Sequence, residues 1–84
     1  MNYELITVVE ILDGLPQTQK SFIIKDETKR GKVQKKVDKL FLKLLRESGL
    51  VDCYEDMDDI VEHGWYYNIK YHYQLYMLYT NIEI

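Results

Sequence analysis

Hydrophobic and polar residues alternate near the N-terminus in the manner of a β-strand. Residues 3–12 are rich in β-branched side chains and largely alternate, which predicts a strand. Asp13, Gly14 and Pro16 then supply the chemistry of a turn. A second strand is predicted over residues 19–25. Two strands with a short connection that contains Gly and Pro predict an antiparallel hairpin.

The strongest helical pattern in the chain follows this hairpin. Its apolar positions recur at intervals of three and four residues, at Val33, Val37, Leu40, Phe41, Leu44 and Leu45. This spacing places them on one face of an α-helix. Asp26 or Thr28 is predicted to cap the start, and Gly31 allows a start as late as Lys32. Gly49 is predicted to end the helix in the left-handed conformation.

A second, shorter helix is predicted from Asp52 to Gly64. Asp52 would be its N-cap, with Glu55 three residues later as an acidic capping partner. The predicted apolar face consists of Cys53, Met57, Ile60 and Val61. On this face Cys53 is expected to be a buried, structural cysteine.

The C-terminal segment is aromatic and extended. Its hydrophobic residues occupy odd positions from Trp65 to Leu75 and even positions from Tyr76 to Ile84. A change of face without Gly or Pro favours one long strand with a bulge or bend, and a hairpin that turns near Gln74 is the alternative.

The order of these elements, β-β-α-α-β(-β), predicts a single small α+β domain over residues 1–84. An antiparallel sheet would be formed by the N-terminal hairpin and by the long aromatic C-terminal strand or hairpin. The two helices would lie on one face of this sheet.

Composition narrows the class of protein. The 84 residues are 46% hydrophobic and 30% charged, which is typical of a folded, globular chain. The single cysteine excludes an internal disulfide and favours a reducing, cytoplasmic location. The N-terminus has no basic segment of the kind found in signal peptides. No apolar run approaches the length of a membrane span, so we expect no membrane partner.

The charges are strongly segregated along the chain. Ten of the eleven basic residues lie between Lys20 and Arg46 with only three acids, which gives this segment a net charge of +7. The rest of the chain has one basic residue and eleven acids, a net charge of −10. Such asymmetry affects association with partners rather than the fold.

Catalytic and metal-binding residues do not form a recognisable set. Cys53 and His63 are ten positions apart on the predicted second helix, about 15 Å along its axis. The acidic run resembles a calcium loop only superficially, because Met57 stands where the sharp turn requires Gly. His63 is read as a favourable charge at a helix C-terminus, and His72 as an exposed residue. We therefore expect no enzyme activity, no catalytic residue, no cofactor and no metal ion.

Two charged surfaces are candidates for binding a partner. A basic face of the first helix is predicted opposite its apolar face and comprises Lys32, Lys35, Lys36, Lys39, Lys43 and Arg46. It would be a solvated face, a face neutralised by the acidic second helix, or a contact surface for a polyanion or an acidic protein. An acidic surface is predicted on the second helix and comprises Glu55, Asp56, Asp58, Asp59 and Glu62.

The aromatic C-terminal segment is a third candidate. Tyr66 and Tyr76 are expected to point away from Tyr67 and Tyr73, so that one face of the strand packs on the first helix and the other stays free. Tyrosine is common at interfaces because it combines a large contact area with a polar tip. We therefore expect a homodimer whose interface includes Tyr66, Tyr76 and Leu78.

These observations predict a small, acidic, non-enzymatic binding protein that covers part of a larger protein with a basic groove. Inhibitors encoded by phages or mobile elements, including anti-CRISPR proteins, and immunity proteins share this general profile. The alternative is a nucleic-acid-binding or transcription-regulating module that uses the basic face of the first helix. A third possibility is a structural subunit that exists only within an oligomer.

Overall fold

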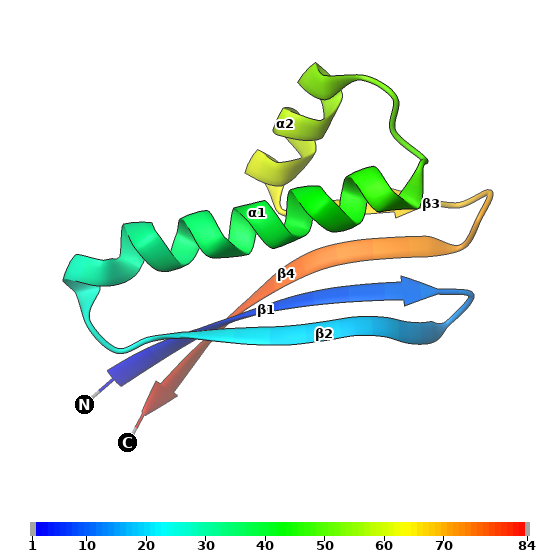
Figure 1. Ribbon diagram of the computed structural model, residues 1–84. Coiled ribbons are helices and arrows are strands. Elements are labelled where there is room, and N and C mark those ends of the chain that lie inside the picture. The colour runs from blue at the N-terminus through cyan, green and yellow to red at the C-terminus, as the bar shows by residue number, and fades with distance from the viewer. Residues whose placement is uncertain (1, 84) are drawn as a thin grey trace.

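The N-terminal hairpin turns through two residues. The computed structural model describes residues 2–83 and begins with β1 (Asn2–Leu12) and β2 (Leu15–Ile24), which pair antiparallel (Figure 1). Asp13 and Gly14 have φ of 52° and 76°, the combination that a type I′ hairpin turn requires. The predicted hairpin is confirmed.

β2 begins earlier than the pattern predicted because it contains a bulge. The register shifts between Glu10 and Ile11, which pair with Thr18 and Pro16, so β2 has one extra residue there. Proline has no amide hydrogen and is accommodated at bulges and on edge strands. β2 is such an edge strand, and Pro16 therefore lies inside the strand instead of ending the turn.

A short 3-10 turn precedes the long helix. The turn η1 (Glu27–Lys29) is capped by Asp26, whose side chain accepts a hydrogen bond from the amide of Thr28. The helix α1 (Arg30–Ser48) follows and ends at Gly49, which has φ of 69°. The predicted apolar face is confirmed, because all six of its residues are buried or packed against the core.

The second helix, α2 (Tyr54–His63), begins later than predicted and without the predicted capping box. Cys53 is its N-cap and has an extended backbone, and no side chain caps the helix. The prediction of a buried Cys53 is wrong, since this side chain is exposed. Cys53 is one turn before Met57 in the sequence, but the extended backbone takes it off the helix face. Gly64 ends α2 with φ of 80°.

The C-terminal segment is a hairpin rather than one bent strand. It consists of β3 (Trp65–Asn68) and β4 (Tyr73–Glu83), paired antiparallel. The hairpin was the less favoured alternative, and its turn occupies residues 69–72 instead of lying near Gln74. His72 takes the left-handed conformation with φ of 50°, and its carbonyl accepts a hydrogen bond from the amide of Asp13. Two turns at the same end of the sheet are thereby joined.

β4 does not change face; both of its faces are hydrophobic. Tyr73, Leu75 and Met77 are buried against the helices. Tyr76 and Leu78 point to the opposite side because successive side chains of a strand alternate. The apparent change of face in the sequence is the switch from one hydrophobic face to the other. Ile84, the last residue of that predicted pattern, lies outside the described residues.

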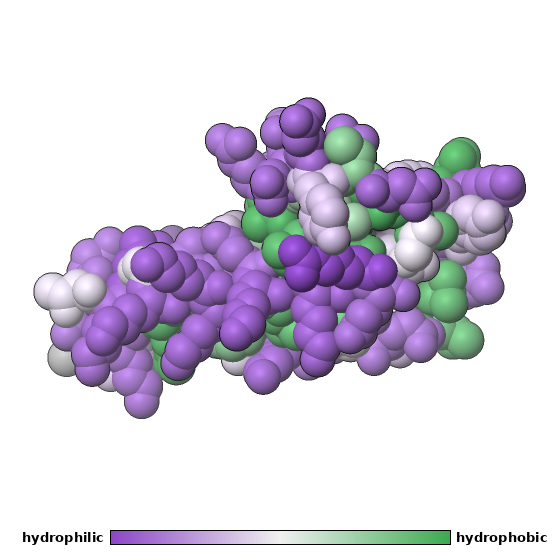
Figure 2. Space-filling view, turned by 45° about the horizontal axis from the view of Figure 1, so that its top comes forward, coloured by the Kyte–Doolittle hydropathy of each residue, from purple (hydrophilic) through white to green (hydrophobic). Residues whose placement is uncertain are grey.

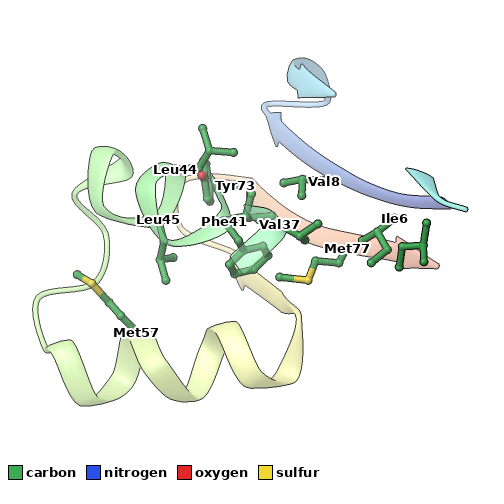
Figure 3. Close-up of a cluster of buried hydrophobic side chains, with 11 residues drawn as sticks. Ile6, Val8, Val37, Phe41, Leu44, Leu45, Met57, Tyr73 and Met77 are labelled. Atoms are coloured by element: carbon green, nitrogen blue, oxygen red, sulfur yellow. The ribbon is translucent and has the colours of Figure 1, made fainter. Parts of the chain in front are cut away.

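The strand order is β2-β1-β4-β3, and the two helices cover one face of this sheet. α1 packs on β1, β2 and β4, and α2 packs on α1 and β3. The predicted α+β class and element order are confirmed. Figure 3 shows the core, in which side chains from both helices meet those of the central strands: Ile6, Val8, Ile24, Val37, Phe41, Leu44, Leu45, Met57, Tyr73, Leu75 and Met77. Within residues 2–83, neither helix has the length and apolar character that crossing a membrane requires.

Candidate interaction surfaces

The acidic surface lies on α2, which projects from the helix layer at an angle to α1 (Figure 1). All of its members are exposed: Glu55, Asp56, Asp58, Asp59 and Glu62. Glu55 and Asp56 occupy the first turn, where the positive end of the helix dipole favours carboxylates. Both ion pairs found within residues 2–83 involve Arg30, so no cation of this part of the chain lies within 4 Å of these carboxylates.

A shallow concavity of about 510 Å³ adjoins the acidic surface. Asp52, Asp56 and Asp59 contribute carboxylates to its rim, and the rest of its lining is mainly apolar. Cys53 also lines it. A positively charged side chain with an apolar stem, such as lysine or arginine, matches this combination of carboxylates and apolar surface.

The basic face of α1 is also exposed and free of ion pairs. Its cations extend along most of the helix, and all of them are exposed: Lys32, Lys35, Lys36, Lys39, Lys43 and Arg46. No carboxylate within residues 2–83 lies within 4 Å of any of them. Arg46 instead lies over the ring of Tyr54, 5.6 Å from its centroid, where α1 meets the start of α2. Direct neutralisation by the acidic helix, one of the expected alternatives, is not observed. In Figure 2 hydrophilic side chains cover most of this side of the molecule.

Tyr66 was expected to share a face of the sheet with Tyr76, and this expectation is wrong. The turn of residues 69–72 pairs odd positions of β3 with even positions of β4, for example Trp65 with Tyr76. Tyr66 therefore lies on the helix side, where its ring centroid is 6.2 Å from that of Tyr73. Its hydroxyl accepts a hydrogen bond from the side-chain amide of Asn68. Tyr76 and Leu78 do lie on the opposite face, together with Trp65.

That opposite face of the sheet is uncovered, and sequence reasoning recognised only part of it. In the observed register it comprises Tyr3, Leu5, Thr7, Val9, Ile11, Pro16, Gln19, Ser21, Ile23, Trp65, Tyr67, Gln74, Tyr76, Leu78, Thr80 and Ile82. We call this set the open sheet face. Trp65 is 62% exposed and Leu78 is 49% exposed. The signal in the sequence was the alternation in residues 3–12. Both glutamates of this segment, Glu4 and Glu10, occupy even positions and therefore lie on the same face as the buried Ile6 and Val8.

A polar network closes one end of the sheet beneath α1. The hydroxyl of Tyr73 donates to Oε2 of Glu10 at 2.5 Å, and the hydroxyl of Thr18 donates to Oε1 at 3.0 Å. Burial, followed by the hydrogen bond to Glu10, raises the pKa of Tyr73. Both carboxylate oxygens are thus occupied, and the network joins β4, β1 and β2.

The two histidines and the cysteine are not brought together into a reactive group. Nδ1 of His63 lies 2.7 Å from the carbonyl oxygen of Asp59, at the end of α2 opposite to Cys53. His72 lies in the turn between β3 and β4. Among the described residues, no three His, Cys, Asp or Glu side chains are grouped so as to hold a metal ion. Comparison with known protein families, curated proteins and solved structures gave no match.

Proposed function

We propose that this protein is a non-enzymatic binding protein that acts by contact with a larger, basic protein. The acidic surface of α2 would make this contact. The observation that carries the proposal is that its five carboxylates are exposed on a projecting helix without a cationic partner. The type of inhibitor expected from the sequence, phage-encoded, anti-CRISPR or immunity-like, belongs to the same proposal and rests on the size and charge of the chain.

The energetics of α2 support a role in binding. Glu55 and Asp59, and likewise Asp58 and Glu62, are like charges four residues apart, and each pair destabilises a helix by about 0.2–0.5 kcal/mol. Beyond the first turn, where the helix dipole favours Glu55 and Asp56, the stability of the isolated protein gives no reason to gather these acids. A basic partner would relieve the repulsion, and its approach would be accelerated by electrostatic attraction at low ionic strength.

The basic face of α1 supports nucleic-acid binding as a second candidate function. Six exposed cations without ion pairs would neutralise backbone phosphates along a helix of about 28 Å. Five of the six are lysines, which bind phosphate as point charges and carry little base specificity. The overall net charge of −3 disfavours this candidate, because it would oppose the approach of a polyanion.

Two variants of matched size separate these candidates. The tagged wild-type chain would be used to capture partners from the cells that produce it. The same capture would be repeated with the Asp58→Ala/Asp59→Ala and Lys35→Ala/Lys39→Ala double variants. We expect a basic protein to bind the wild type and the lysine variant. The acidic-residue variant should associate more slowly and with a weaker salt dependence, while being slightly more stable to urea.

An unchanged association rate and salt dependence in the acidic-residue variant would contradict the proposal. A double-stranded DNA fragment provides the test of the second candidate. Salt-sensitive binding by the wild type that is abolished by Lys35→Glu/Lys39→Glu/Lys43→Glu would favour the basic face of α1 as the working surface.

A further inference from the structure

The open sheet face carries no charged side chain, although 30% of the chain is charged. All charged residues of the four strands lie on the side that the helices cover: Glu4, Glu10, Lys20 and Glu83. A sheet with one face in water normally has the opposite arrangement, with charges on the solvent side. We therefore expect this face to be covered by another surface rather than exposed to water.

The side chains on this face also have the character of an interface core. Aromatic residues are enriched and charged residues depleted at the centre of protein interfaces. Here Val9, Tyr76 and Trp65 lie in one row across three strands, and Tyr67 follows Trp65 on the same face of β3. Val9 is only 7% exposed although no helix covers it, because larger neighbours surround it. The hydroxyls of Thr7 and Ser21 lie 2.9 Å apart and form a hydrogen bond across the two strands, which satisfies one of the two hydroxyl donors.

We propose that a second copy of this chain covers the open sheet face, with the two sheets packed face to face about a two-fold axis. In such an interface the same surface of both copies is in contact, so a charge near the axis would face its own like. The open sheet face has no charge along its whole length, so this repulsion between like charges would not arise. If a different protein covered this face, the face would not need to be free of charge. Two twisted antiparallel sheets pack in this way at a separation of about 10 Å.

The area of the face reaches the lower limit of a specific interface between two copies. Strands spaced about 4.8 Å apart, with a rise of about 3.4 Å per residue, give the face an area of about 550 Å². Two copies would then bury about 1,100 Å², which exceeds the roughly 1,000 Å² expected of a specific interface. The helices would lie on the outside of the dimer, so α2 and α1 would stay accessible. This inference is independent of the proposed function.

The test is the molar mass of the full chain in sedimentation equilibrium at micromolar concentration. We expect twice the 10.1 kDa chain mass for the wild type. Leu78→Lys would place a charge without a partner in the buried, uncharged interface of each copy and should weaken the dimer by about a hundredfold or more. The matched control is Leu15→Lys, because Leu15 is 66% exposed and lies outside this face. It should leave the dimer unchanged.

A wild type that sediments as a monomer would overturn the inference. A dimer that survives Leu78→Lys would overturn it as well, and would point to another contact such as pairing along the free edge of β2. Circular dichroism checks that the variant is folded. If Leu78→Lys does not fold, Thr80→Lys replaces it, because this exposed position on the same face accepts a long side chain without a change in the core.

Discussion

Arg30 links the first turn of α1 to the sheet through Glu4 and to the preceding 3-10 turn through Glu27. Its guanidinium contacts Glu4 of β1, and its Nε lies 2.6 Å from Oε1 of Glu27. The hydrogen bond from Arg30 lowers the pKa of Glu4 below its ordinary value of 4.5. The sequence indicated the helix but not this anchor, because residues 4 and 30 become neighbours only when the hairpin and the helix pack together.

This ion pair predicts a pH-dependent contribution to stability. A carboxyl whose pKa is lower in the folded protein stabilises the fold above its unfolded pKa, and this contribution disappears as the pH falls through the folded pKa. Glu4→Gln should therefore lower the free energy of unfolding at neutral pH and change it little well below pH 4.5. Urea unfolding at both pH values measures this, with Glu83→Gln as control, because Glu83 is exposed at the end of β4. An equal loss at both pH values would contradict an electrostatic role.

At the scale of elements, the sequence was informative where one local pattern dominates. The helical spacing from Val33 to Leu45 and the Asp13-Gly14 turn were both recognised, because each depends on neighbouring residues. The turn at residues 69–72 was missed because it contains neither Gly nor Pro. There His72 adopts a positive φ, and the side chain of Asn68 accepts a hydrogen bond from the amide of Tyr71.

Two glycine substitutions should have opposite effects on stability. Gly14 has φ of 76° with open space around it, so Gly14→Ala would strain only the backbone and should destabilise the protein by about 1–2 kcal/mol. Gly31 also has open space but lies in the first turn of α1, so Gly31→Ala should stabilise by about 0.5–1 kcal/mol. Urea unfolding of both variants measures the difference. Stabilisation by Gly14→Ala would show that the turn is not of the assigned type.

For the whole molecule, the segregation of charge along the sequence becomes a segregation in space. The basic segment forms much of α1, the acidic segment forms α2, and the open sheet face has no charge. The first two features follow from the sequence alone, because each helix is continuous in the chain. The third depends on the register among β1, β2, β3 and β4, which no single segment determines. Tyr66 was assigned to the wrong face for this reason.

The dependence of dimerisation on salt tests this account most directly. If the open sheet face forms the dimer, the dissociation constant of the dimer should stay constant or decrease as the sodium chloride concentration is raised. The reason is that salt does not screen the burial of apolar surface. Sedimentation equilibrium of the wild type over a range of salt concentrations measures it. A dimer that weakens steeply with salt would contradict the account, since it would show that the acidic surface of one copy binds the basic face of the other.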